Sequence, residues 1–155
     1  MTQAICRDLD RLVPCFRARV DVLLERLEAR GFSVQVWETY RSPARVRMLA
    51  AKGTGSARSV HPYGVAVDIV ENDKTPWTLA KPGLWEAISE EAAKLGLHRV
   101  HRRMPNGKRV LDGPHVQALA PKYDLKVAKV PEFERDAWVR ERMLPPKPPD
   151  VIRPA

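Results

Sequence analysis

Apolar side chains recur every three or four residues in two stretches of the chain, residues 16–30 and 84–95. This spacing is typical of a helix with one buried face, and a glycine follows each stretch, where a helix commonly ends. Ser42 and Pro43 indicate a third helix, because they form the pattern of an N-cap followed by proline in the first turn. We expect this helix to continue to about Lys52.

Four other stretches have the pattern of β-strands. Apolar and polar residues alternate over residues 32–37, whereas residues 65–70 are almost continuously β-prone. Residues 97–100 and 109–111 are expected to pair around a turn at residues 105–107, which are Pro-Asn-Gly. Helices and strands are interspersed, with too few βαβ units for a large parallel sheet. We therefore expect an α+β domain, with helices packed on a small, mostly antiparallel sheet.

The length of 155 residues is that of one ordinary domain, which we expect to span residues 1–143. Five of the last twelve residues are proline, which predicts an extended, mobile tail over residues 144–155. No apolar run approaches the roughly 18 residues needed to cross a bilayer. The N-terminus lacks a basic segment followed by an apolar stretch, so we expect the protein to be made in the cytoplasm.

Positive charge exceeds negative charge, with 27 Lys and Arg against 19 Asp and Glu and a net charge of +8. This excess favours a polyanionic partner, namely nucleic acid, anionic lipid or an anionic cell-wall polymer. Residues 98–109 are unusually basic, and we expect them to form a solvated surface, with contact to an anionic polymer as the alternative. His98 and His101 lie within this segment and are not expected to bind metal, because arginines surround them. Cys6 and Cys15 are too few for a disulfide framework and are expected to be reduced thiols.

The first candidate for chemistry is the segment from His61 to Asp68. It places an imidazole just before a predicted strand and a carboxylate on that strand, with Gly64 between them to allow a sharp turn. The neighbours of Asp68 read as a buried strand, where an unpaired carboxylate costs several kcal/mol. Asp68 is therefore expected to bind a metal, to pair with a nearby arginine or to cap a turn.

The second candidate is the segment from Asp112 to His115, in which Gly113 and Pro114 force a non-helical backbone. Zinc catalysis needs three protein ligands, an open position for water and a nearby base that is not itself a ligand. His61, Asp68 and His115 could serve as the three protein ligands, and Asp112 could serve as the base.

Three sequence blocks together resemble the zinc peptidases that trim bacterial peptidoglycan. They are Glu38-Thr39-Tyr40-Arg41-Ser42, Ser59-x-His61-x-x-Gly64-x-Ala66-x-Asp68 and Asp112-x-x-His115. This family includes the D-alanyl-D-alanine carboxypeptidases of the vancomycin-resistance type and the L-alanyl-D-glutamate endopeptidases of phage endolysins. The resemblance implies a hedgehog/DD-peptidase-like α+β fold whose antiparallel sheet carries the site. It covers about residues 35–117, and the basic stretch matches no block of the family.

The resemblance also implies roles for the matching residues. His61, Asp68 and His115 resemble the zinc ligands of the family, and Asp112 stands at the position of its catalytic acid/base. Asp112 would take a proton from the attacking water and pass it to the departing amine.

Two further residues match the family blocks. Arg41 matches an arginine beside the substrate carbonyl, where it would stabilise the oxyanion and contribute to substrate binding. A plain ion pair with Glu38 is the alternative for this arginine. Ser59 matches a serine that positions substrate or supports the site.

The resemblance implies a zinc metallopeptidase that cuts peptidoglycan stem peptides. We expect a monomeric L-alanyl-D-glutamate endopeptidase that acts as a phage or prophage endolysin on the cell wall after release. A D-alanyl-D-alanine carboxypeptidase is the alternative. Anionic wall or outer-membrane polymers are a second expected partner.

From another functional class, a basic nucleic-acid-binding module or a non-catalytic metal-binding module remains open. A stable nucleic-acid partner is not expected, because no Phe, Tyr or Trp lies between Trp85 and Tyr123 to stack on bases.

Overall fold

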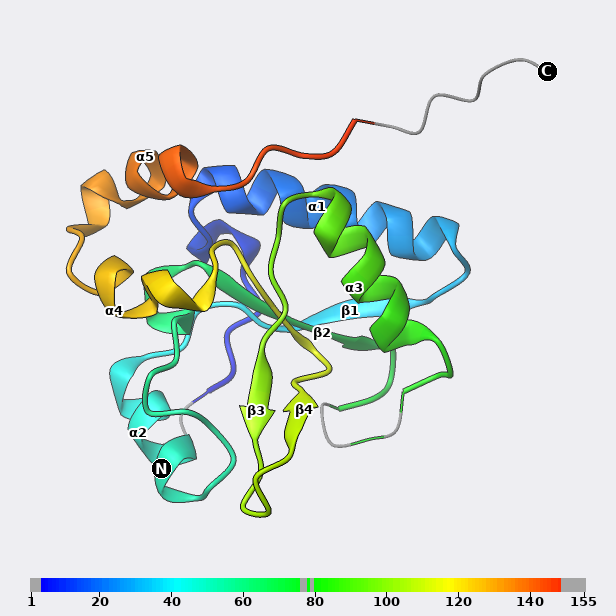
Figure 1. Ribbon diagram of the computed structural model, residues 1–155, viewed down its shortest axis with the longest axis horizontal. Coiled ribbons are helices and arrows are strands. Elements are labelled where there is room, and N and C mark those ends of the chain that lie inside the picture. The colour runs from blue at the N-terminus through cyan, green and yellow to red at the C-terminus, as the bar shows by residue number, and fades with distance from the viewer. Residues whose placement is uncertain (1–3, 76–77, 79, 149–155) are drawn as a thin grey trace.

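The structure is a computed structural model that describes residues 4–75, 78 and 80–148 (Figure 1). It contains five α-helices and five β-strands within these ranges. In chain order they are α1 (Pro14–Ala29), β1 (Val34–Glu38), α2 (Pro43–Ala51), β2 (Ala66–Glu71), α3 (Leu84–Lys94), β3 (His101–Arg103), β4 (Arg109–Leu111), β5 (His115–Gln117), α4 (Asp124–Val127) and α5 (Glu132–Arg142). Three single-turn 3-10 helices lie between them, at Leu9–Arg11, His61–Tyr63 and Pro121–Tyr123.

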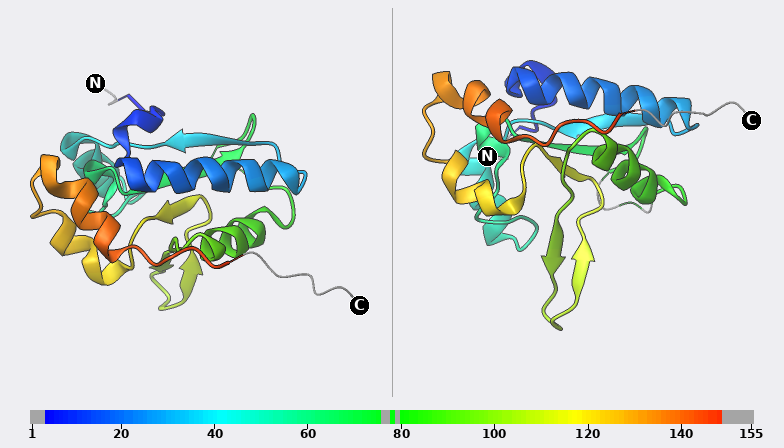
Figure 2. Two further views of the ribbon diagram at one scale, coloured as in Figure 1. Left: turned by 90° about the horizontal axis from the view of Figure 1, so that it is seen from above. Right: turned by 45° about the horizontal axis from the view of Figure 1, so that its top comes forward.

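The strands form one three-stranded sheet in the order β1-β2-β5 and one separate hairpin, β3-β4. All of the pairings are antiparallel. The hairpin projects away from the body of the molecule, whereas α1 and α3 lie against the three-stranded sheet (Figures 1 and 2). The predicted α+β architecture, with a small antiparallel sheet and helices packed on it, is confirmed.

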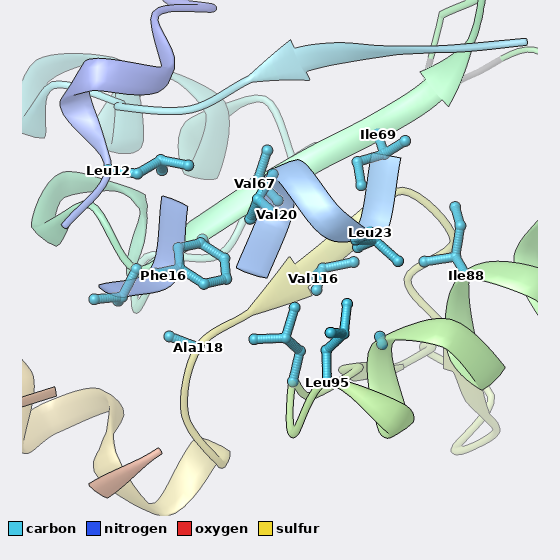
Figure 3. Close-up of a cluster of buried hydrophobic side chains, with 14 of the residues drawn as sticks. Leu12, Phe16, Val20, Leu23, Val67, Ile69, Ile88, Leu95, Val116 and Ala118 are labelled. Atoms are coloured by element: carbon cyan, nitrogen blue, oxygen red, sulfur yellow. The ribbon is translucent and has the colours of Figure 1, made fainter. Parts of the chain in front are cut away.

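The hydrophobic core lies between one face of the three-stranded sheet and the helices. Phe16, Val20 and Leu23 of α1 are fully buried, and they pack with Val67 of β2 and Val116 of β5 (Figure 3). Full burial of each such side chain contributes about 1.5–3 kcal/mol. Because side chains alternate between the two faces of a strand, the residues next to Val67 and Val116 face away from α1.

Three predicted helices and three of the four predicted strands agree closely with the structure, and the helix predicted from Ser42 begins as expected. Ser42 is the N-cap of α2, with its hydroxyl oxygen accepting a hydrogen bond from the Arg45 amide at 3.1 Å. The first strand of the hairpin was predicted at residues 97–100 but lies at His101–Arg103. The reason is tertiary, since Leu97 is buried in the core and His98 pairs with Gln117 of β5 instead. Helix α5 was not predicted, because only Val139 of its residues is buried and its apolar pattern is weak.

The C-terminal segment is held against the domain as far as it is described. The Lys147 amide donates to the Lys94 carbonyl at 2.8 Å, and Arg19 donates to the Leu144 carbonyl. Residues 149–155 of the predicted tail lie outside the described residues. The boundary at residue 143 stays a prediction. No helix in the described part of the chain is long and apolar enough to span a membrane.

Candidate metal centre

Strand register aligns three polar residues across the sheet. Glu38 of β1 pairs with Asp68 of β2, and Asp68 pairs in turn with His115 of β5. A register irregularity between Val36 and Glu38 precedes the first of these pairs. All three residues thus lie at one level of the sheet, and Asp68 is on the central strand.

His61 lies in the short 3-10 helix before β2, and its side chain is almost completely buried. The turn into β2 is made by Gly64, whose φ of +69° is left-handed and whose added Cβ would approach the Arg11 carbonyl oxygen to 2.6 Å. His61 Nδ1 lies 2.7 Å from the Thr39 carbonyl oxygen. Because a carbonyl oxygen can only accept a hydrogen bond, Nδ1 carries the proton of the imidazole. Nε2 is then unprotonated, and its lone pair is free to bind a metal. Nε2 is buried without a hydrogen-bond partner, 3.4 Å from Asp68 Oδ2.

His115 is oriented by Gln117, two residues further along β5. Gln117 Nε2 donates to the Leu119 carbonyl at 2.8 Å and to Asp124 Oδ1 at 3.0 Å, so its amide oxygen faces the imidazole. That oxygen lies 2.9 Å from His115 Nε2 and accepts a hydrogen bond from its N–H group. His115 Nδ1 is therefore the nitrogen that faces Asp68, at 3.3 Å from Oδ1.

The electrostatics of these three groups favour a charged Asp68. Burial raises the pKa of Asp68, but its electrostatic interactions with His61 and His115 outweigh burial and leave the pKa well below its usual range. Burial lowers the pKa of His115, but the hydrogen bond and charge of Asp68 outweigh it and leave that pKa raised. Asp68 and His115 thus each stabilise the charged form of the other.

These three side chains fit a zinc ion. Each offers one ligand atom, and the three atoms lie within 4.8 Å of one another. Two imidazole nitrogens and one carboxylate oxygen form a donor set of the kind found in catalytic zinc sites, which keep a further position open for water or substrate. The opposite nitrogen of each imidazole donates to an oxygen, as in metal sites whose ligands are held by neighbouring groups. The buried, unpartnered Nε2 of His61 is the atom that a metal would satisfy.

Arg41 lies beside this group and is paired with Glu38. Its Nη2 is 2.7 Å from Glu38 Oε1 and 3.5 Å from Asp68 Oδ2, so both ion pairs considered from the sequence are present. Its Nη1 has a weaker contact, 3.5 Å from the hydroxyl of Ser59. Ser59 also accepts a hydrogen bond from the His61 amide at 3.3 Å, which connects it to the candidate ligand.

Asp112 lies next to the three ligands but not among them. Its amide donates to the Val100 carbonyl at 2.8 Å, and its carbonyl accepts from the His115 amide at 3.1 Å. Its negative charge contributes to the raised pKa of His115. This half-buried carboxylate is therefore close enough to influence the site electrostatically.

Arg99 corrects the expectation that the basic segment lies wholly on the surface. Its guanidinium donates to the His115 carbonyl at 2.6 Å and to the Gly113 carbonyl at 2.7 Å, and Nε donates to Ser89 Oγ at 3.0 Å. Burial lowers its pKa to about 10, even though the charges of Asp112 and Asp68 oppose this shift. Arg99 thus holds the loop that carries a candidate ligand.

Sequence reasoning missed Thr39, Gln117 and Arg99 as supports of the site. Gln117 carried a usable signal, because it lies two residues from His115 and so on the same face of a strand. Thr39 acts through its backbone carbonyl, which no side-chain pattern reveals. Of the two histidines excluded as ligands, His101 is exposed and His98 is half-buried, and neither belongs to the group.

The two cysteines are free thiols, as expected. Burial, together with a hydrogen bond to Asp136, raises the pKa of Cys15 to about 12. This thiol therefore stays protonated at neutral pH and is a poor nucleophile.

Comparison with solved structures finds distant likenesses. The chain is similar to the vancomycin-resistance D,D-pentapeptidase VanY in complex with Zn(II), with a TM-score of 0.47, 19% identity and coverage of 75% of this chain and 77% of that chain. It is similar to the LD-carboxypeptidase LdcB, with a TM-score of 0.48, 13% identity and coverage of 86% and 70%. It is also similar to the L-Ala D-Glu endopeptidase ChiX of Serratia marcescens, with a TM-score of 0.46, 24% identity and coverage of 80% and 92%.

All three are peptidases by name. At these scores the likeness concerns the backbone alone. No family model matches the sequence, and no curated protein has a significant match to it.

Proposed function

We propose that this protein is a zinc metallopeptidase that hydrolyses peptide bonds in peptidoglycan stem peptides. The observation that carries the proposal is the pair of imidazoles with fixed proton positions. The free nitrogens of His61 and His115 both face the carboxylate of Asp68, at 3.4 and 3.3 Å. The motifs that supply these residues resemble those of the peptidoglycan peptidases.

His61, Asp68 and His115 would hold the zinc ion. When bound, zinc would supply Lewis-acid polarisation of the scissile carbonyl and a lowered pKa for a water ligand. The Thr39 carbonyl and the Gln117 amide keep the two imidazoles in the orientation that binding requires. Because these supports are already in place, little reorganisation is needed when metal binds.

Asp112 and Arg41 would act on the substrate. Asp112 would accept a proton from the attacking water and return it to the nitrogen of the departing amine. Arg41 would donate from Nη1 to the carbonyl oxygen as negative charge develops there, since its other donors are engaged by Glu38 and Asp68. Ser59, in contact with Nη1, would hold the guanidinium toward the substrate.

For specificity, we propose cleavage within the stem peptide, as an L-alanyl-D-glutamate endopeptidase. A carboxypeptidase must hold a free C-terminal carboxylate beside the scissile bond, usually with an arginine or lysine. Among the described residues, Arg41 and Arg99 contact the site; Arg99 is engaged by backbone carbonyls, Arg41 Nε and Nη2 are engaged by carboxylates, and only Arg41 Nη1, assigned above to the scissile carbonyl, is left. This favours the endopeptidase over the D-alanyl-D-alanine carboxypeptidase.

We further propose that the enzyme is an endolysin of a phage or prophage, made in the cytoplasm and released to the wall. The support for this role is the resemblance of the three motif blocks to endolysins of this type. Adding purified protein to permeabilised bacteria tests it, and lysis is the expected result. Absence of lysis by a protein that cuts isolated wall would contradict the endolysin role.

The direct test of the activity is digestion of purified peptidoglycan with and without a chelator. Mass spectrometry of the products is expected to find new N-terminal D-glutamate, and the chelator is expected to abolish its appearance. Free D-alanine instead would establish the carboxypeptidase, and activity that survives chelation would contradict the zinc mechanism. Zinc binding without any cleavage would favour a non-catalytic metal-binding module.

A further inference from the structure

The β3–β4 hairpin is a basic arm without acidic residues. Between His101 and Leu111 the sequence contains four Lys and Arg residues and no Asp or Glu. These four residues are all exposed, and the hairpin that carries them projects from the body of the molecule (Figures 1 and 2). They are Arg102, Arg103, Lys108 and Arg109.

The charges of this arm are not balanced within the protein. In the part of the chain that the structure describes, none of the four side chains forms an ion pair or a side-chain hydrogen bond. Arg103 and Arg109 are direct register partners, so two positive charges lie opposite each other across the hairpin. Like charges in this arrangement destabilise a strand pair. An anion bound between them would relieve the repulsion.

The arm begins at the candidate metal centre. Strand β4 ends at Leu111, the next residue is Asp112, and His115 follows three residues later. At about 3.3 Å per extended residue, Arg109 lies within roughly 20 Å of His115. A polymer that lies across the metal centre would therefore meet the arm beyond the peptide being cut.

We propose that the four cations of the arm bind free carboxylates of the peptidoglycan network next to the stem peptide under attack. This inference rests on the proposed function and adds a second contact to it, with the polymer instead of the scissile peptide. Stem peptides contain acidic amino acids, so an intact wall presents many carboxylates at repeated spacing. The arm contains no aromatic side chain that could stack on bases, which disfavours single-stranded nucleic acid as the partner.

The test compares a polymer with a short substrate. A variant with Arg102→Ser, Arg103→Ser, Lys108→Ser and Arg109→Ser removes the charge of the arm. At low salt its kcat/KM on intact sacculi is expected to fall roughly tenfold, because a cluster of charges raises the local concentration and encounter rate of a polyanion. Its kcat/KM on a soluble stem peptide is expected to stay unchanged. The difference should vanish at about 1 M NaCl, where the screening length is about 3 Å.

A matched control separates the arm from net charge. Lys52→Ser, Arg58→Ser, Lys74→Ser and Lys129→Ser change four exposed cations elsewhere and alter the net charge by the same amount. This control is expected to keep most of its activity on sacculi. An arm variant in which all four positions are Lys should retain the activity as well. Equal losses in the control and the arm variant would overturn the proposal.

Binding is measured separately from catalysis, by co-sedimentation of each protein with sacculi in the presence of a chelator. The arm variant is expected to sediment less than the wild type and the control. If neither the wild type nor the variants cleave the soluble peptide, the proposed function fails. The co-sedimentation comparison still tests the arm in that case. Unchanged sedimentation, together with lost binding to duplex DNA, would overturn the proposal in favour of nucleic acid.

Discussion

Asp68 and His115 are register partners on adjacent antiparallel strands, and His115 Nδ1 lies 3.3 Å from Asp68 Oδ1. The pairing of β2 with β5 therefore sets the distance between two of the three candidate ligands. A slip of one residue would turn one ligand toward the hydrophobic core and bring Val67 or Val116 to the site face. The burial of Val67 and Val116 against α1 thus protects the geometry of the metal centre.

Zinc affinity is expected to fall as the pH is lowered. The pKa of His115 is raised by Asp68, so below that pKa a proton occupies the nitrogen that must bind the metal. One competing proton lowers the affinity about tenfold per pH unit in this range. Competition titrations with a zinc-selective chelator between pH 5 and 8 would measure the slope. An affinity that does not change with pH would show that His115 is not a ligand.

Metal binding and catalysis are expected to separate in two single variants. His61→Ala removes a candidate ligand and should lose zinc. Asp112→Ala should keep zinc, because this residue lies outside the ligand group, but hydrolysis should fall by about 100- to 10,000-fold. Metal analysis of the purified proteins, together with the wall-digestion assay, checks both. Full activity in Asp112→Ala would show that its assigned role is wrong.

Gln117 is expected to act on the metal through His115. Gln117→Leu removes the oxygen that accepts the hydrogen bond from His115 Nε2, so the imidazole loses its fixed orientation. Loss of such a support typically lowers metal affinity about 10- to 100-fold. Gln35→Leu places the same substitution on β1, where no side-chain hydrogen bond is described, and serves as the control. Zinc titration by calorimetry should distinguish the two, and equal affinities would contradict the role of Gln117.

Glu38 is expected to be important for stability. The residue is 1% exposed, and its carboxylate pairs with both Arg41 and Arg45, which are also buried. Glu38→Ala would leave two buried cations without this partner, and breaking a buried pair costs about 3–5 kcal/mol. Denaturant unfolding would measure the loss. Glu25→Ala, at an exposed position of α1, should change the free energy of unfolding by less than about 0.5 kcal/mol.

The sequence predicted those elements whose signal is local. The N-cap at Ser42, the apolar spacing of α1 and α3, and the β-prone stretch around Asp68 each depend on neighbouring residues, and the structure has these elements where they were expected. Helix α5 has only one buried residue, so its apolar pattern was too weak to indicate it. The first hairpin strand was misplaced because contacts with β5, far along the chain, decide where it begins.

The candidate site divides in the same way. Residue chemistry selected His61, Asp68, His115 and Asp112 as candidates, because a carboxylate in a buried strand and histidines beside glycine turns are unusual in a sequence. The resemblance of the motif blocks added Arg41 and Ser59. Only the tertiary structure decided which nitrogen of each imidazole is free, since this depends on the Thr39 carbonyl and the Gln117 amide. It also decided that Arg99 turns inward while the rest of the basic segment extends outward. Hydrogen bonds between distant residues fix these choices, and they exist only once the strands have paired.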